Sequence, residues 1–201
     1  MKYFMPYLSA QIDNLVFIDE THFVSSDLWK KHGWFLLGCL PLNIDQNLWN
    51  KESLSLLMAI GVDGIVHYSI KDHESGVGVK ALDFVEFLLD LDLKLPQNKI
   101  IIMDNAKIHK SAIVRAAVTG MMDAGRSVLY QSPYSPELNP IELSFGWLKK
   151  KVKNVVQAPQ DLHETVENVL KTVKSKECGD TIRHVFKNIP PNATIPAQFL
   201  V

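Results

Sequence analysis

The sequence has little of several features that would mark a special class of protein. Only two of its 201 residues are cysteines, Cys39 and Cys178, and they lie far apart. They form neither a disulfide framework nor a CxxC metal site, so we expect the chain to fold in a reducing compartment. No apolar run approaches the roughly 20 residues that span a bilayer. Pro6 and Asp13 interrupt the apolar residues at the start, so we expect neither a signal peptide nor a membrane partner.

The chain also lacks internal repeats, low-complexity linkers and a strong net charge. Hydrophobic residues make up 47% and charged residues 21% of the sequence. With this length, that composition is typical of a folded soluble protein with one main domain. The net charge of −1 hides an asymmetry: residues 1–104 carry 8 Lys/Arg against 14 Asp/Glu, and residues 105–153 carry 8 against 3. This is compatible with a carboxylate site beside a polyanion-binding surface, although most charge runs are solvated faces.

Hydrophobic periodicity predicts strands early in the chain and helices later. The expected strands cover 14–20, 33–40, two segments within 53–70 that turn at Asp63–Gly64, 99–105 and 127–130. The expected helices cover 79–93, 111–122, a segment that starts at Pro140, and 161–175. A meander of three to four early strands, followed by two strands reached by helical crossovers, predicts an α/β fold of the ribonuclease-H-like kind, a mixed five-stranded sheet flanked by helices.

Acidic residues stand at the ends of two predicted strands and at the start of a predicted helix. Asp19 ends the first strand, and Asp104 ends the strand after the first helix. If these strands are neighbours, both carboxylates meet at one edge, where hard oxygen ligands suit Mg²⁺ or Mn²⁺. For either aspartate alone, a turn or cap is the more common role. Glu142 also has a local alternative, since Asn139, Pro140 and Glu142 have the spacing of a capping box.

Three segments together resemble the motifs of a known family. FIDET around Asp19, IIMDNAKIH around Asp104 and SPYSPELNPIELSFGWLK around Glu142 resemble the catalytic motifs of mariner-like DDE transposases, which belong to the DDE superfamily endonucleases. The order Asp, Asp, Glu and the 38 positions from Asp104 to Glu142 also match the style of that family. WKKHGWFLLG (29–38) is similar to its second strand, and the resemblance covers about residues 14–156.

The resemblance implies a metal-dependent DNA endonuclease and strand transferase. Asp19, Asp104 and Glu142 would be its catalytic residues and would bind two Mg²⁺ (or Mn²⁺) ions per active site. Such an enzyme cleaves DNA and joins the freed 3′-OH to target DNA by in-line phosphoryl transfer. The alternative is a domesticated or decayed transposase domain that binds nucleic acid or assembles without catalysis. An aspartyl-nucleophile phosphatase is disfavoured, because Asp19-Glu20-Thr21-His22 lacks the second aspartate of that pattern.

Other motif residues are expected to support the site: Asn105, His109, Asn139 and Pro140. His109 either approaches the scissile phosphate, supports Asp104 or has a structural role. Asn139 and Pro140 are expected to orient Glu142 through the start of the helix. Glu20 is either a supporting neighbour of Asp19 or a solvated strand end.

Four lysines form the densest basic cluster: Lys149, Lys150, Lys151 and Lys153. The resemblance places their helix near DNA, where each lysine could neutralise a phosphate. The alternative is a solvated helix end that favours cations. The implied partners are the DNA of transposon ends and target, together with a second copy of the chain in a homodimer.

We expect a catalytic domain over residues 1–178 and a proline-rich C-terminal tail over 179–201. The first predicted strand begins near residue 14, so we expect the N-terminal helix-turn-helix domain of longer relatives to be absent. Sequence recognition would then come from a separate DNA-binding domain or chain. We expect a nuclear location if the source is eukaryotic and a cytoplasmic one otherwise. The basic segment KKKVK (149–153) is not a convincing nuclear-localisation signal, because it lies within a predicted helix.

Overall fold

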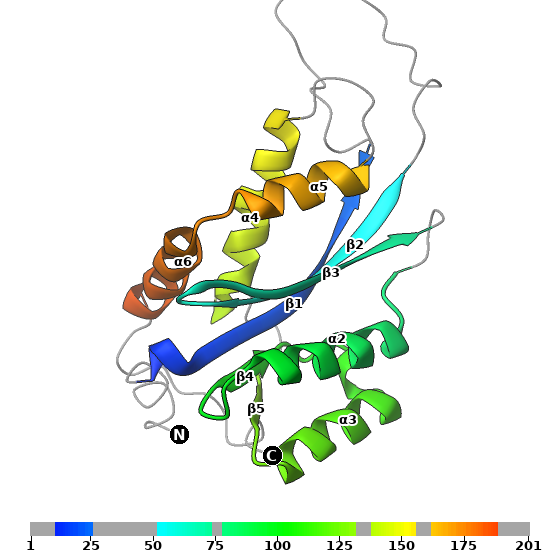
Figure 1. Cartoon of the computed structure of the whole chain (residues 1–201), viewed down its shortest axis with the longest axis vertical. Helices are drawn as coiled ribbons and strands as arrows, with labels where there is room; N and C mark the ends of the chain where they lie inside the picture. The colour runs from blue at the N-terminus through cyan, green and yellow to red at the C-terminus, as the bar shows by residue number, and fades with distance from the viewer. Residues whose placement is uncertain (1–10, 26–51, 74–77, 132–137, 156–161, 189–201) are drawn as a thin grey trace, which may run out of the picture.

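The strands form one mixed sheet in the order β3-β2-β1-β4-β5 (Figure 1). The computed structural model describes residues 11–25, 52–73, 78–131, 138–155 and 162–188. The strands of the sheet are β1 (Leu15–Val24), β2 (Ser53–Gly61), β3 (Gly64–His73), β4 (Ile100–Met103) and β5 (Ser127–Tyr130). β1, β2 and β3 form an antiparallel meander, whereas β4 runs parallel to both β1 and β5. The expected mixed five-stranded sheet is confirmed; the strand expected at 33–40 lies outside the described residues.

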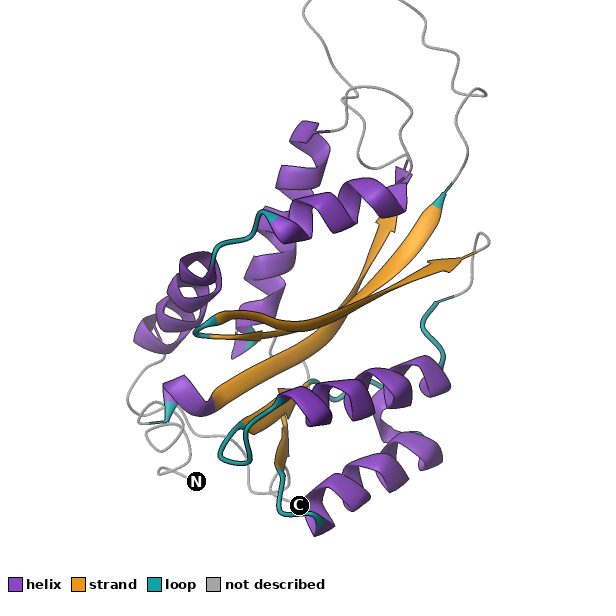
Figure 2. Cartoon of the chain, in the orientation of Figure 1, coloured by secondary structure: helices purple, strands orange, loops and turns teal. Residues whose placement is uncertain are grey.

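Helices cover both faces of the sheet, so the fold has three layers (Figure 2). One face carries α2 (Ala81–Lys94) and α3 (Ala112–Asp123), and the other carries α4 (Pro140–Val155), α5 (Leu162–Lys171) and α6 (Ser175–Asn188). Two short 3₁₀ turns, η1 (Ile12–Asn14) and η4 (Ile108–Lys110), precede β1 and α3. No helix in the described part of the chain combines the length and apolar character needed to cross a bilayer.

β1 is the central strand, and its side chains pack into two separate hydrophobic cores. Leu15 and Phe17 pack on the α4–α6 side, while Val16 and Ile18 pack on the α2–α3 side. All four are buried. Because successive side chains of a strand point to opposite faces, an apolar run without alternation is what this doubly covered strand requires.

The turn between β2 and β3 forms where the sequence predicts it. β2 ends at Gly61 and β3 begins at Gly64, which has φ +123°. This backbone conformation is easy only for glycine. The turn lies against α6, where a Cβ on Gly179 would stand 2.7 Å from the carbonyl oxygen of Val62.

α6 crosses the boundary expected between the catalytic domain and a C-terminal tail. The helix runs from Ser175 to Asn188, and its Cys178 and Ile182 are fully buried in the core beneath α4 and α5. A cut at 178/179 would divide this helix in its first turns. The folded domain therefore extends beyond that expected boundary, at least to residue 188, because the apolar stripe of α6 is needed to cover the sheet.

Candidate active site

Asp19 and Asp104 are brought together by the pairing of β1 with β4. The last paired residues of these parallel strands are Ile18 and Met103, so the next residue on each strand is an aspartate. β1 continues to Val24, whereas β4 ends at Met103 and Asp104 begins the following loop. The structure thus places both predicted aspartates at one position of the sheet.

Asp19 is almost completely buried, with 7% of its surface exposed. Its Oδ1 accepts a hydrogen bond from the Glu20 backbone N–H, and its Oδ2 accepts one from the Asn139 side-chain amide, each at 2.8 Å. Burial raises the pKa of Asp19, and the charges of Glu20, Asp104 and Glu142 add to the effect. The pKa reaches about 8, although the bond from the Glu20 N–H opposes the rise. The hydrogen bonds to Asp19 therefore do not compensate for its burial and for the negative charges of its three acidic neighbours.

Asp104 is held by the loop that follows β4. Its Oδ1 accepts a hydrogen bond from the Ala106 backbone N–H at 3.0 Å and lies 2.6 Å from Nδ1 of His109. Burial raises the pKa of Asp104, but the hydrogen bonds from His109 and Ala106 and the charge of His109 outweigh it. The pKa is therefore lowered. With 39% of its side chain exposed, Asp104 is both ionised and accessible.

His109 lies beneath the surface between two carboxylates. Its side chain is fully buried and stacks on the ring of Phe84, with centroids 4.2 Å apart. Its Nε2 lies 3.0 Å from Oε2 of Glu20, opposite the contact with Asp104. Burial lowers the pKa of His109, but its hydrogen bonds to Asp104 and Glu20 and their charges raise the pKa to about 10. Of the roles left open for His109, support of Asp104 fits this enclosed position, and contact with a scissile phosphate does not.

Asn105 connects the end of β4 to the end of β5. Its side-chain amide donates a hydrogen bond to the carbonyl of Gln131 at 3.3 Å. The Gln131 backbone N–H donates to Met103 at 2.8 Å, and its side chain donates to the carbonyl of Leu138 at 3.2 Å. These bonds link the ends of β4 and β5 to the segment that starts α4.

Helix α4 begins at Pro140 as predicted, with Glu142 in its first turn, but the predicted capping box is wrong. The Glu142 N–H bonds to the backbone carbonyl of Asn139 at 3.2 Å. The Asn139 side chain turns instead to Asp19, 120 residues away, and its Oδ1 has no partner. The side-chain NH2 donates to a carboxylate, a strong acceptor, and in this orientation Oδ1 does not receive the Glu142 N–H. Asn139 therefore positions Asp19 directly, while the side chain of Glu142 is exposed.

The carboxylates fit a magnesium or manganese site by their chemistry. Within the described residues, no group of three or more His, Cys, Asp or Glu side chains is gathered closely enough to enclose a metal ion. Mg²⁺ does not need such a cage, since one or two carboxylates suffice and water and phosphate oxygens complete its shell. Asp19 and Asp104 would be that pair, and the charge of Glu142 acts on Asp19 from α4.

The four predicted DNA-binding lysines lie on two faces of α4. Lys151 turns toward α6, where its Nζ lies 2.6 Å from Oε1 of Glu177. This ion pair balances the charge of Lys151 with that of Glu177. The other three are exposed: Lys149, Lys150 and Lys153.

Two contacts of the site are not identifiable from local sequence: that of Glu20 with His109, and that of Phe84 with the same ring. Glu20 faces the α2–α3 side of the sheet and meets His109, which is 89 residues away. Phe84 belongs to the buried stripe of α2, and that stripe by itself indicates only a core position. The one available signal was the alternation of β1, which turns Asp19 and Glu20 to opposite faces.

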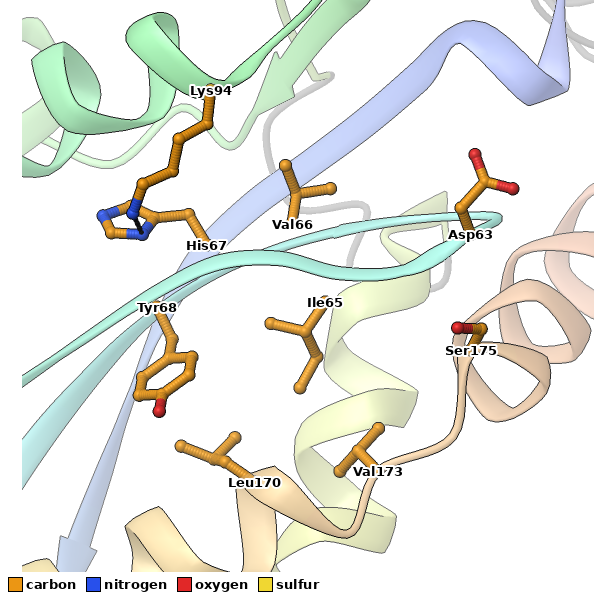
Figure 3. Close-up of a pocket in the computed structure, with 9 residues that line it drawn as sticks. All are labelled: Asp63, Ile65, Val66, His67, Tyr68, Lys94, Leu170, Val173 and Ser175. Carbon is orange, nitrogen blue, oxygen red and sulfur yellow. Dashed lines mark hydrogen bonds between the residues drawn. The ribbon is translucent and has the colours of Figure 1, made fainter.

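A separate hollow of about 570 Å³ lies along the edge strand β3 (Figure 3). On one side of the strand, His67 Nδ1 lies 2.7 Å from Lys94 Nζ. On the other side, Ile65 and Tyr68 face Leu170 of α5. None of the predicted site residues lines this hollow, so it is distinct from the carboxylates.

Solved structures of the Mos1 transposase share this fold. The Mos1 paired-end complex with left transposon end superposes with a TM-score of 0.68 at 15% identity, covering 92% of this chain and 56% of that chain. The Mos1 mariner catalytic domain gives 0.61 at 17% identity, covering 92% and 84%. Its complex with raltegravir and Mg gives 0.62 at 16%, covering 92% and 86%. The chain thus spans little more than half of the longer Mos1 chain, and no curated protein sequence matches it.

The fold is ribonuclease-H-like, as in the Mos1 catalytic domain. Identities this low establish only that. The family follows from the sequence itself, since residues 14–165 match the DDE superfamily endonuclease model. The chain belongs to that family, and the match includes Asp19, Asp104 and Glu142.

Because Asp19 is buried, we expect the free energy of unfolding of the metal-free protein to depend on pH. With its pKa raised from 3.8 to about 8, the folded protein holds this proton more tightly than the unfolded chain. The contribution of Asp19 to stability therefore falls as pH rises from about 4 to about 8. Asp19→Asn removes this loss, so in EDTA its Tm should exceed that of the wild type by about 3 °C or more at pH 8. The gap should shrink toward pH 5; parallel Tm profiles would contradict the assignment.

Proposed function

We propose that the chain is the catalytic domain of a DDE transposase, a metal-dependent DNA endonuclease and strand transferase. The observation that carries the proposal is the β1–β4 pairing, which sets Asp19 beside Asp104. The charge of Glu142, at the start of α4, acts on the same carboxylate. The Mos1 relatives support it, since their catalytic domain has been solved with Mg and with Mn, and a longer form with a left transposon end.

Asp19, Asp104 and Glu142 would hold two Mg²⁺ or Mn²⁺ ions. Bound ions of this kind act as Lewis acids that activate water and stabilise the charge on attacking and leaving oxygens. The protein residues keep their donor oxygens in place: Asn139 and the Glu20 N–H hold Asp19, while His109 and the Ala106 N–H hold Asp104. Such fixed donors need no reorganisation during the reaction.

The reaction consists of two in-line displacements at phosphorus. In the first, water attacks the scissile phosphodiester, the bond from phosphorus to the 3′ oxygen breaks, and a 3′-OH is released. In the second, that 3′-OH attacks a phosphodiester of target DNA. A new phosphorus–oxygen bond forms while the bond to the target's own 3′ oxygen breaks, so no external energy source is required.

One stripe of α4 connects this chemistry to a DNA-binding surface. At 3.6 residues per turn, Gly146, Lys149 and Lys153 share the exposed face of Glu142. Lys149 stands about 10 Å further along the helix axis than Glu142, at 1.5 Å per residue. Lys151 points to the other side, at Glu177. We place the DNA backbone along the Glu142 stripe, with transposon ends and target DNA as the substrates. Homodimer formation and end recognition by a separate DNA-binding domain or chain belong to the same proposal.

Removing any of the three acidic groups should abolish DNA cleavage. We expect Asp19→Ala, Asp104→Ala and Glu142→Gln each to lower nicking of supercoiled plasmid in Mg²⁺ or Mn²⁺ by about 1000-fold or more, because each would remove a metal ligand. Asp180→Asn, on the exposed surface of α6, is the matched control and should leave cleavage unchanged. Cleavage that survives Asp104→Ala would refute the site. DNA binding without cleavage in any form of the protein would favour a non-catalytic nucleic-acid-binding module.

The two faces of α4 should differ in their salt dependence. Lys149→Ala and Lys153→Ala should each lower the slope of log K against log salt for duplex DNA by about 1, because each removes one phosphate contact. Lys151→Ala should leave that slope unchanged, since its charge is paired with Glu177. Fluorescence anisotropy at several salt concentrations measures all three. Equal slopes for all variants would refute the proposed DNA path.

Gly146 provides a test that separates DNA contact from folding. A Cβ at Gly146 would meet no atom within 4 Å, and the same holds for Gly120 in α3. Replacing either with alanine should raise the free energy of unfolding by up to about 1 kcal/mol. If DNA approaches the α4 backbone here, Gly146→Ala should also weaken DNA binding, while Gly120→Ala should not. A Gly146→Ala variant that is more stable and binds DNA normally would place the DNA elsewhere.

A further inference from the structure

Glu20, His109 and Asp104 form one continuous chain of polar contacts. Oε2 of Glu20 lies 3.0 Å from Nε2 of His109, and Nδ1 of His109 lies 2.6 Å from Oδ1 of Asp104. The imidazole has no exposed surface, while the Glu20 side chain is 29% exposed. An ionised carboxylate only accepts hydrogen bonds. The His109 ring therefore bridges the two carboxylates, with one ring nitrogen within hydrogen-bond distance of each.

The surroundings of His109 restrict how its ring is oriented. The ring of Phe84 stacks on it at an interplanar angle of 24°, and the Tyr130 hydroxyl donates to the His109 backbone carbonyl at 3.4 Å. Stacking restrains the plane of the ring, but a half-turn about Cβ–Cγ would keep that plane and exchange the ring nitrogens with carbons. The carboxylates that face the two nitrogens select one of these orientations, and within the described residues Glu20 is the side chain that contacts Nε2.

The position of the His109 ring in turn sets that of Asp104. Both His109 and the Ala106 N–H contact the same oxygen, Oδ1. No donor in the described part of the chain contacts Oδ2 of Asp104. With one oxygen occupied and the other open, the carboxylate presents a single defined oxygen on its accessible side.

We propose that Glu20 is a positioning residue that acts through His109 to hold Asp104 in its ligand-binding orientation. This inference rests on the proposed function, because it assigns Asp104 as a metal ligand. It gives neighbouring residues of β1 different tasks. Asp19 faces α4 and binds metal, whereas Glu20 faces α2, where it fixes the histidine that supports the second ligand.

The test measures Mn²⁺ affinity by electron paramagnetic resonance, without DNA and without reading activity. We expect Glu20→Ala to weaken Mn²⁺ binding by about 10- to 100-fold, the usual effect of losing a residue that supports a metal ligand. Glu20→Gln keeps an oxygen acceptor for Nε2 and should weaken binding less. Glu86→Gln, an exposed glutamate of α2 paired with Lys71, is the matched control and should have no effect.

A double-mutant cycle tests whether Glu20 acts through His109. In a His109→Ala background, Glu20→Ala should cause no further loss of Mn²⁺ affinity, because the path between Glu20 and Asp104 is already broken. Ring ¹⁵N NMR of His109 gives a second readout. Glu20→Ala should change the Nε2 signal of the metal-free protein, because it removes the acceptor that faces that nitrogen.

The outcomes separate this inference from the proposed function. If Asp104→Ala leaves Mn²⁺ affinity unchanged, the metal site itself is wrong. If Asp104→Ala abolishes binding while Glu20→Ala has no effect, only the role of Glu20 is wrong. If Glu20→Ala and Glu20→Gln both abolish binding, and do so equally in the His109→Ala background, Glu20 is a direct ligand and the positioning role is overturned.

Discussion

The parallel pairing of β1 with β4 is the constraint on which the rest of the site depends. It is short, since β4 has only four residues, and its register ends at Ile18 and Met103. A slip of one residue would turn every following side chain to the opposite face and separate Asp19 from Asp104. Two cores prevent that slip. Leu15 and Phe17 are buried against α4–α6, and Val16 and Ile18 against α2–α3, so a shift would exchange side chains of different size and shape between two close-packed cores.

This packing offsets an arrangement that is unfavourable in itself. Burial and three neighbouring carboxylates raise the pKa of Asp19 to about 8, so without a metal ion the contribution of Asp19 to stability falls as pH rises from about 4 toward 8. The polar contacts stabilise the two aspartates to different extents. Asp104 has a histidine as partner, whereas the donors to Asp19 among the described residues are neutral, the Glu20 N–H and Asn139. Asp19 is therefore the aspartate that is harder to ionise, and a divalent cation would stabilise its charged form.

The sequence predicted the parts of this structure that depend on local pattern and motif. The turn before Gly64, the start of α4 at Pro140 and the two strand-end aspartates all follow from residues close in sequence. Contacts across long separations were not predictable. The Asn-Pro-Ile-Glu pattern favoured a capping box, but the Asn139 side chain is oriented by its bond to a carboxylate 120 residues away, and its Oδ1 caps nothing. Helix α6 was hidden by the proline-rich end that follows it, although Cys178, Ile182 and Val185 already have helical spacing and are buried.

In α4 the helical period of 3.6 residues determines which side chains face the core, which face α6 and which are exposed. Ile141, Phe145 and Leu148 form its buried stripe and hold it against the sheet, so the helix cannot rotate without losing core contacts. Glu142 then points away from that core, at the end of the helix where Asn139 contacts Asp19. The same rigid rotation places Lys151 against Glu177 of α6 and leaves Lys149 and Lys153 exposed. The hydrophobic stripe therefore sets both the side from which a carboxylate reaches the site and the side from which DNA would approach it.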